Sequence, residues 1–262
     1  MGYRTSERLP LIESEPSNKG IYQDLFSLAA KKVGCTLHIK RAPKKRILAW
    51  LKQGKIDFYP GLGFNLTRQN YLYFAENGLQ AHTVILTHND IDSITSFTDL
   101  KGKILLKPYG SRDFDLANQG IMIRHGQDID LNGAITLLEK RQVDLFIHNK
   151  DSLLFYLANH PNTAVKIHDC CFNKKPMHLG FSKASKHFAS SSNQRFDSSQ
   201  PISPSNLPLT VEKHTLAYQF LEAVKKVAQS KTFKQQQNRY YRYSAALESE
   251  QLASSDISET KH

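Results

Sequence analysis

Hydrophobic and polar positions along the first quarter of the chain switch repeatedly between helical and strand-like spacing. In 21–33 the apolar residues recur every three or four positions, which predicts an amphipathic helix ended by the glycine that follows. Residues 35–40 alternate between apolar and polar, as a half-buried strand does. A second helix is expected over 43–53, opened by a proline and closed by a glycine, and a strand over 56–59. This succession of helices and strands predicts an α/β fold.

The end of one helix and the strand after it occur again later in the chain. Residues 50–59 align with 137–146, and each segment ends a helix, turns tightly and opens a strand at an apolar–Asp–apolar triplet. The two aspartates are Asp57 and Asp144. A unit that occurs twice is typical of two similarly built lobes, because solenoid arrays need at least three shorter repeats. The sequence therefore predicts two lobes.

Strand-like runs and the distribution of charge mark the boundaries of these lobes. Residues 82–87 and 178–182 are apolar runs that suit two crossings between lobes. The chain carries a net charge of +11, yet 88–177 holds eleven basic and eleven acidic residues, so the excess lies outside this middle segment. The predicted lobes are therefore 1–84 with 181–243, and 85–180.

Two segments near the end of the chain have a different composition. Residues 184–210 are rich in Ser, Asn, Gln and Pro, which predicts an insertion that is either a docking loop or a disordered excursion. Helical spacing returns over 211–229 and 231–241. The Ser- and Glu-rich residues 244–262 are expected to form a disordered tail.

The overall composition excludes several classes of protein. Hydrophobic residues make up 40% of the chain, the mean hydropathy is -0.47, and no apolar stretch approaches the roughly 18 residues of a membrane span. Three cysteines are too few for a disulfide scaffold, and the adjacent Cys170 and Cys171 are interpreted as inert thiols. No secretory signal is visible at the N-terminus, so the protein is either cytoplasmic or a mature or truncated form.

The sequence lacks the spacing of familiar catalytic, metal and nucleotide motifs. Gly61 and Gly63 have Leu66 where a dinucleotide fingerprint needs its third glycine. No histidine pair has convincing metal-ligand spacing. The basic run 40–55 contains Trp50 as its only aromatic residue, so stacking on nucleic acid is not expected. We therefore predict no catalytic residue, no metal, no cofactor and no nucleic-acid partner.

Five segments, taken in order, resemble the bacterial extracellular solute-binding proteins of the amino-acid type, family 3. They are Gly20–Leu25 at the start of a helix, Leu51–Asp57, Thr67–Arg68 with Phe74 six residues on, Asp99–Lys103 followed by Gly110–Ser111, and Gln142–Phe146. Together with the helices after Val211, the resemblance covers roughly 3–183 and 211–241.

The resemblance implies the two-lobed periplasmic binding fold of type II. Each lobe would be a central mixed sheet flanked by helices, and two hinge strands would join the lobes. A small anionic or zwitterionic ligand, an amino acid or an organic acid, would bind in the cleft, and the lobes would close by hinge bending. The protein is then expected to be a periplasmic monomer that delivers its ligand to an ABC transporter permease. Because no signal peptide is visible in the chain, the periplasmic localisation rests on the resemblance.

Several ligand-binding positions carry over from the family. Arg68 matches the family's carboxylate-binding arginine, whose planar guanidinium grips a carboxylate with two hydrogen bonds. Gly63 and Asn65 stand where the family has hydroxyl residues, and Gly63 still offers its backbone N–H. In the second lobe Ser111 matches a small hydroxyl residue that meets the ligand's carboxylate, with Arg112 beside it.

Three positions depart from the family pattern. Asn149 stands where the family has the acid that pairs with the ligand's α-ammonium, and an amide cannot supply the opposing charge. Arg8 and Lys44 stand near two positions of family aromatics. These departures favour an anionic ligand without an essential ammonium, such as a small organic acid or a dicarboxylate. Alternatively, the alignment is displaced by one or two residues and an ordinary amino acid binds, with Asp151 or Asp144 as its counter-ion.

Two other functions occur on the same fold. A ligand-sensing module of a membrane receptor would use the same cleft, so the sequence does not separate sensing from transport. A cyclohexadienyl or prephenate dehydratase-like enzyme would use a cleft carboxylate as general acid or base, and no acid of this chain aligns with such a position. We therefore predict a binding protein rather than an enzyme.

Overall fold

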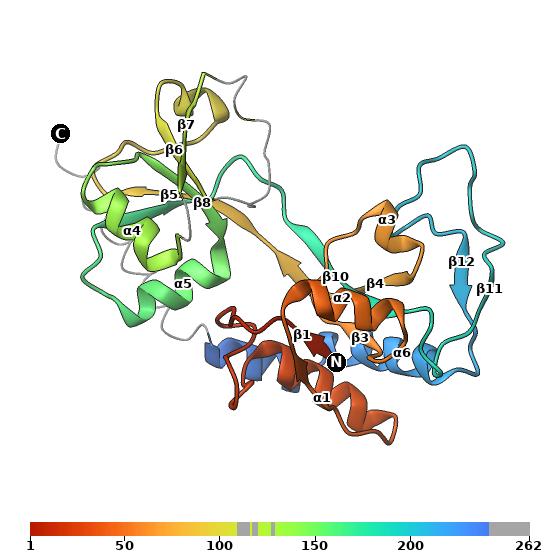
Figure 1. Ribbon diagram of the computed structural model, residues 1–262. Helices are drawn as coiled ribbons and strands as arrows, with labels where there is room; N and C mark the ends of the chain where they lie inside the picture. Colours follow the sequence, from red (N-terminus) through yellow and green to blue (C-terminus); the bar gives the residue numbers. More distant parts are fainter. Residues whose placement is uncertain (109–115, 117–119, 127–128, 241–262) are drawn as a thin grey trace. The chain divides into compact units, whose positions relative to one another are not determined.

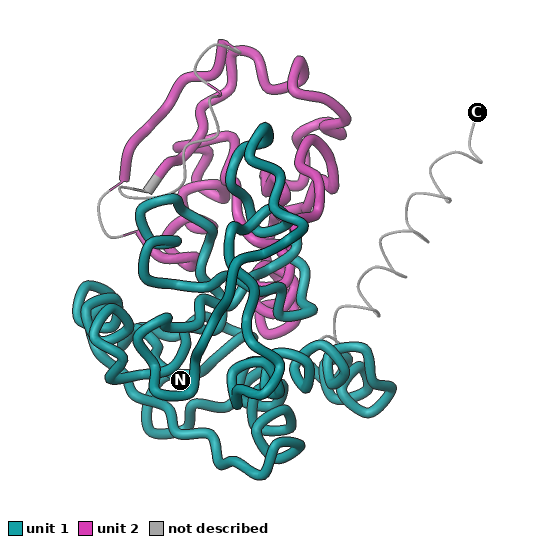
Figure 2. The backbone as a smooth tube through the Cα atoms, turned by 90° about the vertical axis from the view of Figure 1, so that its right-hand side faces the viewer, with its two compact units in different colours: residues 1–80, 176–240 teal, residues 81–175, 241–262 magenta. Residues whose placement is uncertain are grey.

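The computed structural model describes residues 1–108, 116, 120–126 and 129–240. The predicted tail over 244–262 lies outside these residues. Two compact units are present, shown in Figure 2: the first joins 1–80 to 176–240, and the second is 81–175. The chain passes between them twice, at points four and five residues before the boundaries expected from the sequence.

Two long helices, α1 (Ile21–Lys32) and α6 (Leu216–Gln229), pack against each other in the first unit. The Phe26 ring of α1 lies 6.3 Å from the Phe220 ring of α6. The helical spacing of the apolar residues in α1 is confirmed, since its buried side chains are Ile21, Tyr22, Leu25, Phe26, Ala29 and Ala30.

The start of α6 differs from the prediction because a side chain caps it. The Thr215 hydroxyl accepts a hydrogen bond from the Tyr218 backbone N–H at 3.1 Å, which fixes the first turn four residues after Val211. Val211 itself belongs to a strand. A further helix covers 231–240.

The strands of the first unit are short. β1 (Gly2–Tyr3) pairs in parallel with β2 (Lys40–Arg41), while β3 (Phe58–Tyr59), β10 (Lys175–Ser182) and β4 (Leu72–Ala81) form a sheet in the order β3-β10-β4. The strand predicted over 35–40 is therefore wrong for most of its length. Apolar alternation marks one buried face, but a strand also needs a hydrogen-bonded neighbour, and β1 pairs only with Lys40 and Arg41.

Two shorter helices complete the framework of the first unit. α2 (Lys44–Lys52) begins after Pro43 and buries Ile47 and Leu51, and α3 (Leu66–Gln69) follows the loop after β3. The phenyl rings of Phe64 and Phe74 lie 5.2 Å apart and pack this loop against β4.

The segment over 184–210 is an ordered part of the first unit. β11 (Ser190–Ser192) and β12 (Leu209–Val211) form an antiparallel pair at its ends. Between them the Asn206 amide donates to the Asp197 backbone carbonyl at 2.9 Å and its oxygen accepts from the Asp197 N–H at 3.0 Å. The alternative of a disordered excursion is therefore wrong, because local side-chain bonds hold the segment and its Phe188 ring packs on Phe181 with centroids 6.0 Å apart.

The second unit is built around a mixed five-stranded sheet. The order is β7 (Met122–Gly126), β6 (Ile104–Pro108), β8 (Leu145–Asn149), β5 (Thr83–His88) and β9 (Val165–His168). β6 runs parallel to β7 and to β8, and β5 runs antiparallel to both of its neighbours.

Alternate residues of these strands feed two apolar clusters on opposite faces of the sheet. Val84 and Phe146 belong to a cluster that includes residues of helices α4 (Leu131–Glu139) and α5 (Lys150–Asn159), whose positions Figure 1 shows. Ile85 and Leu145 belong to the other cluster, which includes Leu100 at the end of the short 3-10 helix η1 (Phe97–Leu100).

A disulfide between neighbouring residues packs against this second cluster. Cys170 and Cys171 are joined to each other, whereas Cys35 is a free thiol in the first unit. The interpretation of the pair as inert thiols is therefore wrong. Disulfides and metal sites are predicted from the spacing between cysteines, and two adjacent cysteines have no spacing from which a bond could be predicted.

Candidate ligand-binding site

Aromatic rings and cationic side chains gather where β1 and β3 end in the first unit. Tyr3 ends β1 and Tyr59 ends β3, and their rings stack with centroids 5.2 Å apart. The ring of Tyr22 from α1 meets that of Tyr3 edge-on at 5.9 Å. We call this region the tyrosine edge. The first cation on it, Arg4, follows β1 directly.

Arg41 holds the backbone around Arg4. Its guanidinium donates to the Arg4 carbonyl at 2.8 Å, to the Asn18 side-chain oxygen at 2.7 Å and to the Glu13 carbonyl. It also lies over the Tyr3 ring, 5.1 Å from the centroid. Arg41 thus uses its donors within the protein, and the backbone that presents Arg4 is fixed by it.

Lys44, Arg68 and Arg4 come together at this edge from three different elements. Lys44 is the first residue of α2 and Arg68 lies in α3. Burial lowers the pKa of Lys44, and the positive charges of Arg68 and Arg4 lower that pKa further. The structure therefore brings two of the predicted site residues within electrostatic reach of each other and adds Arg4 to them.

Arg8 belongs to the same group. Burial raises the pKa of Tyr22 and of Tyr59, and the charges of Arg8 and Arg4 oppose this rise at both phenols. A hydrogen-bonded bridge between the backbones of Arg8 and Ile12 fixes the loop that carries Arg8. The charges of Arg8 and Arg4 thus act on the phenols of the tyrosine edge, and those of Lys44 and Arg68 act next to Arg4.

The loop before α3 positions Arg68. The Asn65 side chain caps α3 by accepting from the Arg68 backbone N–H at 3.1 Å, so this amide has a structural task. The Arg68 guanidinium donates one bond to the Gly63 carbonyl at 3.3 Å. A side chain at Gly63 would meet no atom within 4 Å, so this face of the loop is open. Predicted residues Gly63, Asn65 and Arg68 therefore form one local unit.

The remaining predicted residues belong to the second unit. The Asn149 side chain accepts from the Ser152 backbone N–H at 3.3 Å and so caps α5. Ser111 and Arg112 lie outside the described residues. Asp151, the acid considered as a substitute counter-ion, is in the first turn of α5.

The sequence analysis missed Arg4 and the three tyrosines. A usable signal was present, because Arg4 is the first cation after an apolar strand, and ligand groups gather beyond the carboxyl ends of strands in α/β folds. The sequence analysis did not single out the tyrosines. Their contribution depends on stacking across β1, β3 and α1, which is visible only in three dimensions.

The four cations have no carboxylate partner among the described residues. The ion pairs found there do not include Arg4, Arg8, Lys44 or Arg68. The negative charges of Glu15 and Glu7 act on Arg41, where they oppose the burial that lowers its pKa. Among the residues that the structure describes, no group of three or more His, Cys, Asp or Glu side chains could hold a metal ion. The edge is therefore suited to an anion.

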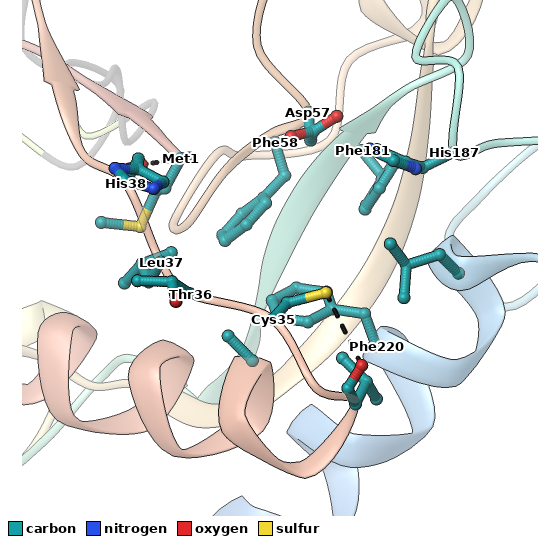
Figure 3. A pocket seen from close by; sticks show the side chains of 13 residues that line it. Met1, Cys35, Thr36, Leu37, His38, Asp57, Phe58, Phe181, His187 and Phe220 are labelled. Carbon is teal, nitrogen blue, oxygen red and sulfur yellow. Dashed lines mark hydrogen bonds between the residues drawn. The ribbon is translucent and has the colours of Figure 1, made fainter.

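A separate cavity of about 270 Å³ lies in the first unit, where residues of α1, β3, β10 and α6 line it (Figure 3). Its walls include the rings of Phe58, Phe181 and Phe220. The Met1 amino group donates to the His38 carbonyl at 2.8 Å, and burial lowers the pKa of this amine to about 6. No predicted ligand residue lines this cavity, whose polar lining residues are Thr36, His38, Asp57 and His187.

Similar solved structures share the fold of this chain at low sequence identity. The ligand-binding core of GluR0 in complex with L-glutamate has a TM-score of 0.67 at 15% identity, covering 92% of this chain and 96% of that one. The unliganded open L-cystine solute receptor of Neisseria gonorrhoeae has a TM-score of 0.65 at 20% identity, covering 92% and 91%. An ancestral arginine-binding protein bound to glutamine has a TM-score of 0.61 at 20% identity, covering 92% and 96%.

The family model gives the more specific finding. A comparison with curated proteins yields no significant match. The model of the bacterial extracellular solute-binding proteins, family 3, matches residues 5–243, which span both units and every predicted site residue. Within the described residues, no helix has the length and apolar character needed to cross a membrane. The α/β units, the repeated helix–turn–strand and this match agree: the chain belongs to the bacterial extracellular solute-binding proteins, family 3.

Proposed function

We propose that this solute-binding protein captures a small carboxylate-bearing ligand in the periplasm and delivers it, as a monomer, to an ABC transporter permease. The observation that carries the proposal is the set of four cations on the tyrosine edge without a carboxylate partner among the described residues. Structures that share the fold include a substrate-binding protein of an amino-acid ABC transporter, which supports the transporter as partner.

Arg68 is the proposed anchor for the carboxylate. A guanidinium has five N–H donors in a plane, and the Gly63 carbonyl occupies one of them. Two parallel donors can therefore bind both oxygens of a carboxylate, which gives direction as well as affinity. The open face of Gly63 leaves room for a ligand beside this guanidinium.

Ligand capture without chemical turnover is the proposed mode of action. A dehydratase-like reaction needs a positioned general acid or base, and the groups that gather at the tyrosine edge are cations and phenols. Incubation with prephenate, followed by ultraviolet absorbance of an aromatised product, tests this point. We expect no turnover above a buffer blank, and turnover by the purified protein would contradict the proposal.

A thermal-shift screen of amino acids and organic acids tests the proposed function. A ligand at 100 times its Kd adds about 2.7 kcal/mol of stability, which corresponds to roughly 5–10 °C for a protein of this size. We expect Arg68→Ala to remove most of that shift and Arg68→Lys to restore only part of it, because an ammonium lacks the bidentate geometry.

The matched control is Arg195→Ala, since Arg195 is an exposed arginine on the loop between β11 and β12 of the same unit. This control should keep the full ligand-induced shift. An Arg68→Ala protein that is folded and shifts as much as the wild type would remove Arg68 from the site.

A further inference from the structure

The tyrosine edge carries more positive charge than one carboxylate can balance. The Ala42 N–H bonds to the Tyr3 carbonyl at 3.1 Å, so Arg4 lies beside the segment that leads into Lys44 at the start of α2. The charges of Arg4 and Arg68 both lower the pKa of Lys44. Like charges at short range repel, and the repulsion grows as water is excluded from the site. A ligand with a single negative charge would leave most of this repulsion in place.

Two buried polar atoms at the same edge lack hydrogen-bond partners among the described residues. They are Nε of Arg4 and the hydroxyl of Tyr22, whose side chain is fully buried. Buried donors are normally paired, and each unpaired one has a free-energy cost. A Cβ at Gly61 would lie 1.9 Å from the Tyr22 hydroxyl oxygen, so a glycine at this position leaves space for the hydroxyl. Gly61 is at the start of the loop that carries Arg68. The edge is therefore short of acceptors as well as of negative charge.

The first turn of α2 adds to this positive potential. Lys44, Lys45 and Arg46 occupy the turn, no acidic residue accompanies them, and no side chain caps the helix. A helix N-terminus already has partial positive charge from its free N–H groups, and acids usually occupy it. In α2 this position is occupied by cations instead. They make the electrostatic potential next to Arg4 and Arg68 more positive, which disfavours a ligand ammonium there.

We propose that the ligand is a small organic dianion without an ammonium group, a dicarboxylate, held by Arg4, Lys44 and Arg68. This inference rests on the proposed function and names the ligand class of the same site. One carboxylate binds to Arg68, and the second lies between Lys44 and Arg4, where it offsets the repulsion among the cations. An α-amino acid would have to place its ammonium in the same positive field without a carboxylate partner from the edge.

Matched ligand pairs test the ligand class by isothermal titration calorimetry on the full chain. Glutarate and glutamate differ only in the α-ammonium, as do succinate and aspartate, and pentanoate has the chain of glutarate with one carboxylate. We expect each dicarboxylate to bind at least about tenfold more tightly than its amino-acid partner, because an unpaired desolvated ammonium is costly. Pentanoate should bind more weakly than glutarate by a similar factor.

The variants Lys44→Gln and Lys45→Gln locate the second carboxylate. Both residues are lysines of the first turn of α2 with exposed side chains, and the charges of Arg4 and Arg68 act on Lys44. We expect Lys44→Gln to weaken glutarate about tenfold and pentanoate much less, while Lys45→Gln changes both by less than about twofold. Circular dichroism establishes that both variants are folded.

The outcomes separate this inference from the function on which it rests. Glutamate or aspartate binding more tightly than the matched dicarboxylate would overturn the dianion and leave a carboxylate-binding protein. An equal effect of Lys44→Gln on glutarate and pentanoate would overturn the assignment of the second carboxylate. Failure of all dicarboxylates, monocarboxylates and amino acids to bind would overturn the proposed function as well.

Discussion

Gly54 and Arg141 adopt the same left-handed backbone conformation at equivalent places in the two units, with φ of 69° and 56°. Each follows the last turn of a helix. The N–H after Gly54 bonds to the Trp50 carbonyl at 2.9 Å, and the N–H after Arg141 bonds to the Leu137 carbonyl at 2.9 Å. The repeat in the sequence therefore corresponds to two turns of the same conformation. Each ends a helix, one before β3 and the other before β8.

Substitution of Gly54 by alanine is expected to destabilise the protein by more than about 2 kcal/mol. A left-handed φ costs an alanine about 1 kcal/mol, and the added Cβ would lie 2.2 Å from the Ala184 carbonyl oxygen, which is backbone and cannot move aside alone. Urea-induced unfolding measures the loss.

The matched change in the second unit, Arg141→Gly, should alter stability by less than about 1 kcal/mol. Glycine adopts the left-handed φ of Arg141 without a steric penalty, which stabilises the protein. The change also removes the exposed ion pair between Arg141 and Asp90, so the two effects on stability oppose each other. Equal losses for Gly54→Ala and Arg141→Gly would contradict this account of the two turns.

Stability should fall as the pH falls from 6.5 to 4 because of His168. Its Nδ1 accepts from the Ile94 backbone N–H at 3.0 Å, so Nε2 carries the proton and donates to the Thr87 hydroxyl at 2.8 Å. Burial lowers the pKa of His168 from 6.5 to about 4. The neutral form is therefore native, and its stabilisation is complete above pH 6.5. Between pH 6.5 and 4 the unfolded chain takes up a proton that the folded chain does not, at a cost of up to about 3 kcal/mol.

Unfolding in urea at pH 7, 5.5 and 4.5 measures this slope. In His168→Gln the amide can accept from Ile94 and donate to Thr87 without titrating, so part of the slope should disappear. His214→Gln is the control, because the His214 side chain is 78% exposed and should leave the slope intact. An unchanged slope in His168→Gln would assign the acid sensitivity to other groups.

Thiol counting under denaturing conditions should give one free thiol before reduction and three after it. Cys170 and Cys171 are joined to each other, so only Cys35 reacts without a reductant. A Cys35→Ser protein should then give none before reduction and two after. Three thiols in the unreduced wild type would show that the bond between neighbours does not form.

Asn149→Asp should shift the ligand preference toward amino acids. The resemblance places Asn149 where the family has the acid for the α-ammonium, and aspartate caps a helix about as well as asparagine, so α5 should be preserved. We expect the ratio of glutamate to glutarate affinity to rise at least about tenfold. Calorimetry on the wild type and the variant measures the ratio, and an unchanged ratio would place the ammonium position elsewhere.

Local chemistry explains which elements could be predicted. The helix over 21–33 was predicted almost to its end, because apolar spacing and a following glycine act within a few residues. The strand over 35–40 was not, because a strand exists only beside a partner distant in the sequence. The insertion was misjudged for a related reason: the bonds of Asn206 to Asp197 join polar residues nine positions apart, a pairing that composition does not reveal.

The sequence by itself determined the α/β class, the repeated turn and the family, and it singled out Arg68, Lys44 and Arg8 as candidate ligand residues. These features depend on residue type and short-range spacing, which the chain carries in one dimension. Only the tertiary structure decided that Arg4 joins Lys44 and Arg68, and that Cys170 bonds to Cys171. Electrostatic coupling depends on distance through space, and the elements that bring these charges together meet only when β1, α2 and α3 have packed.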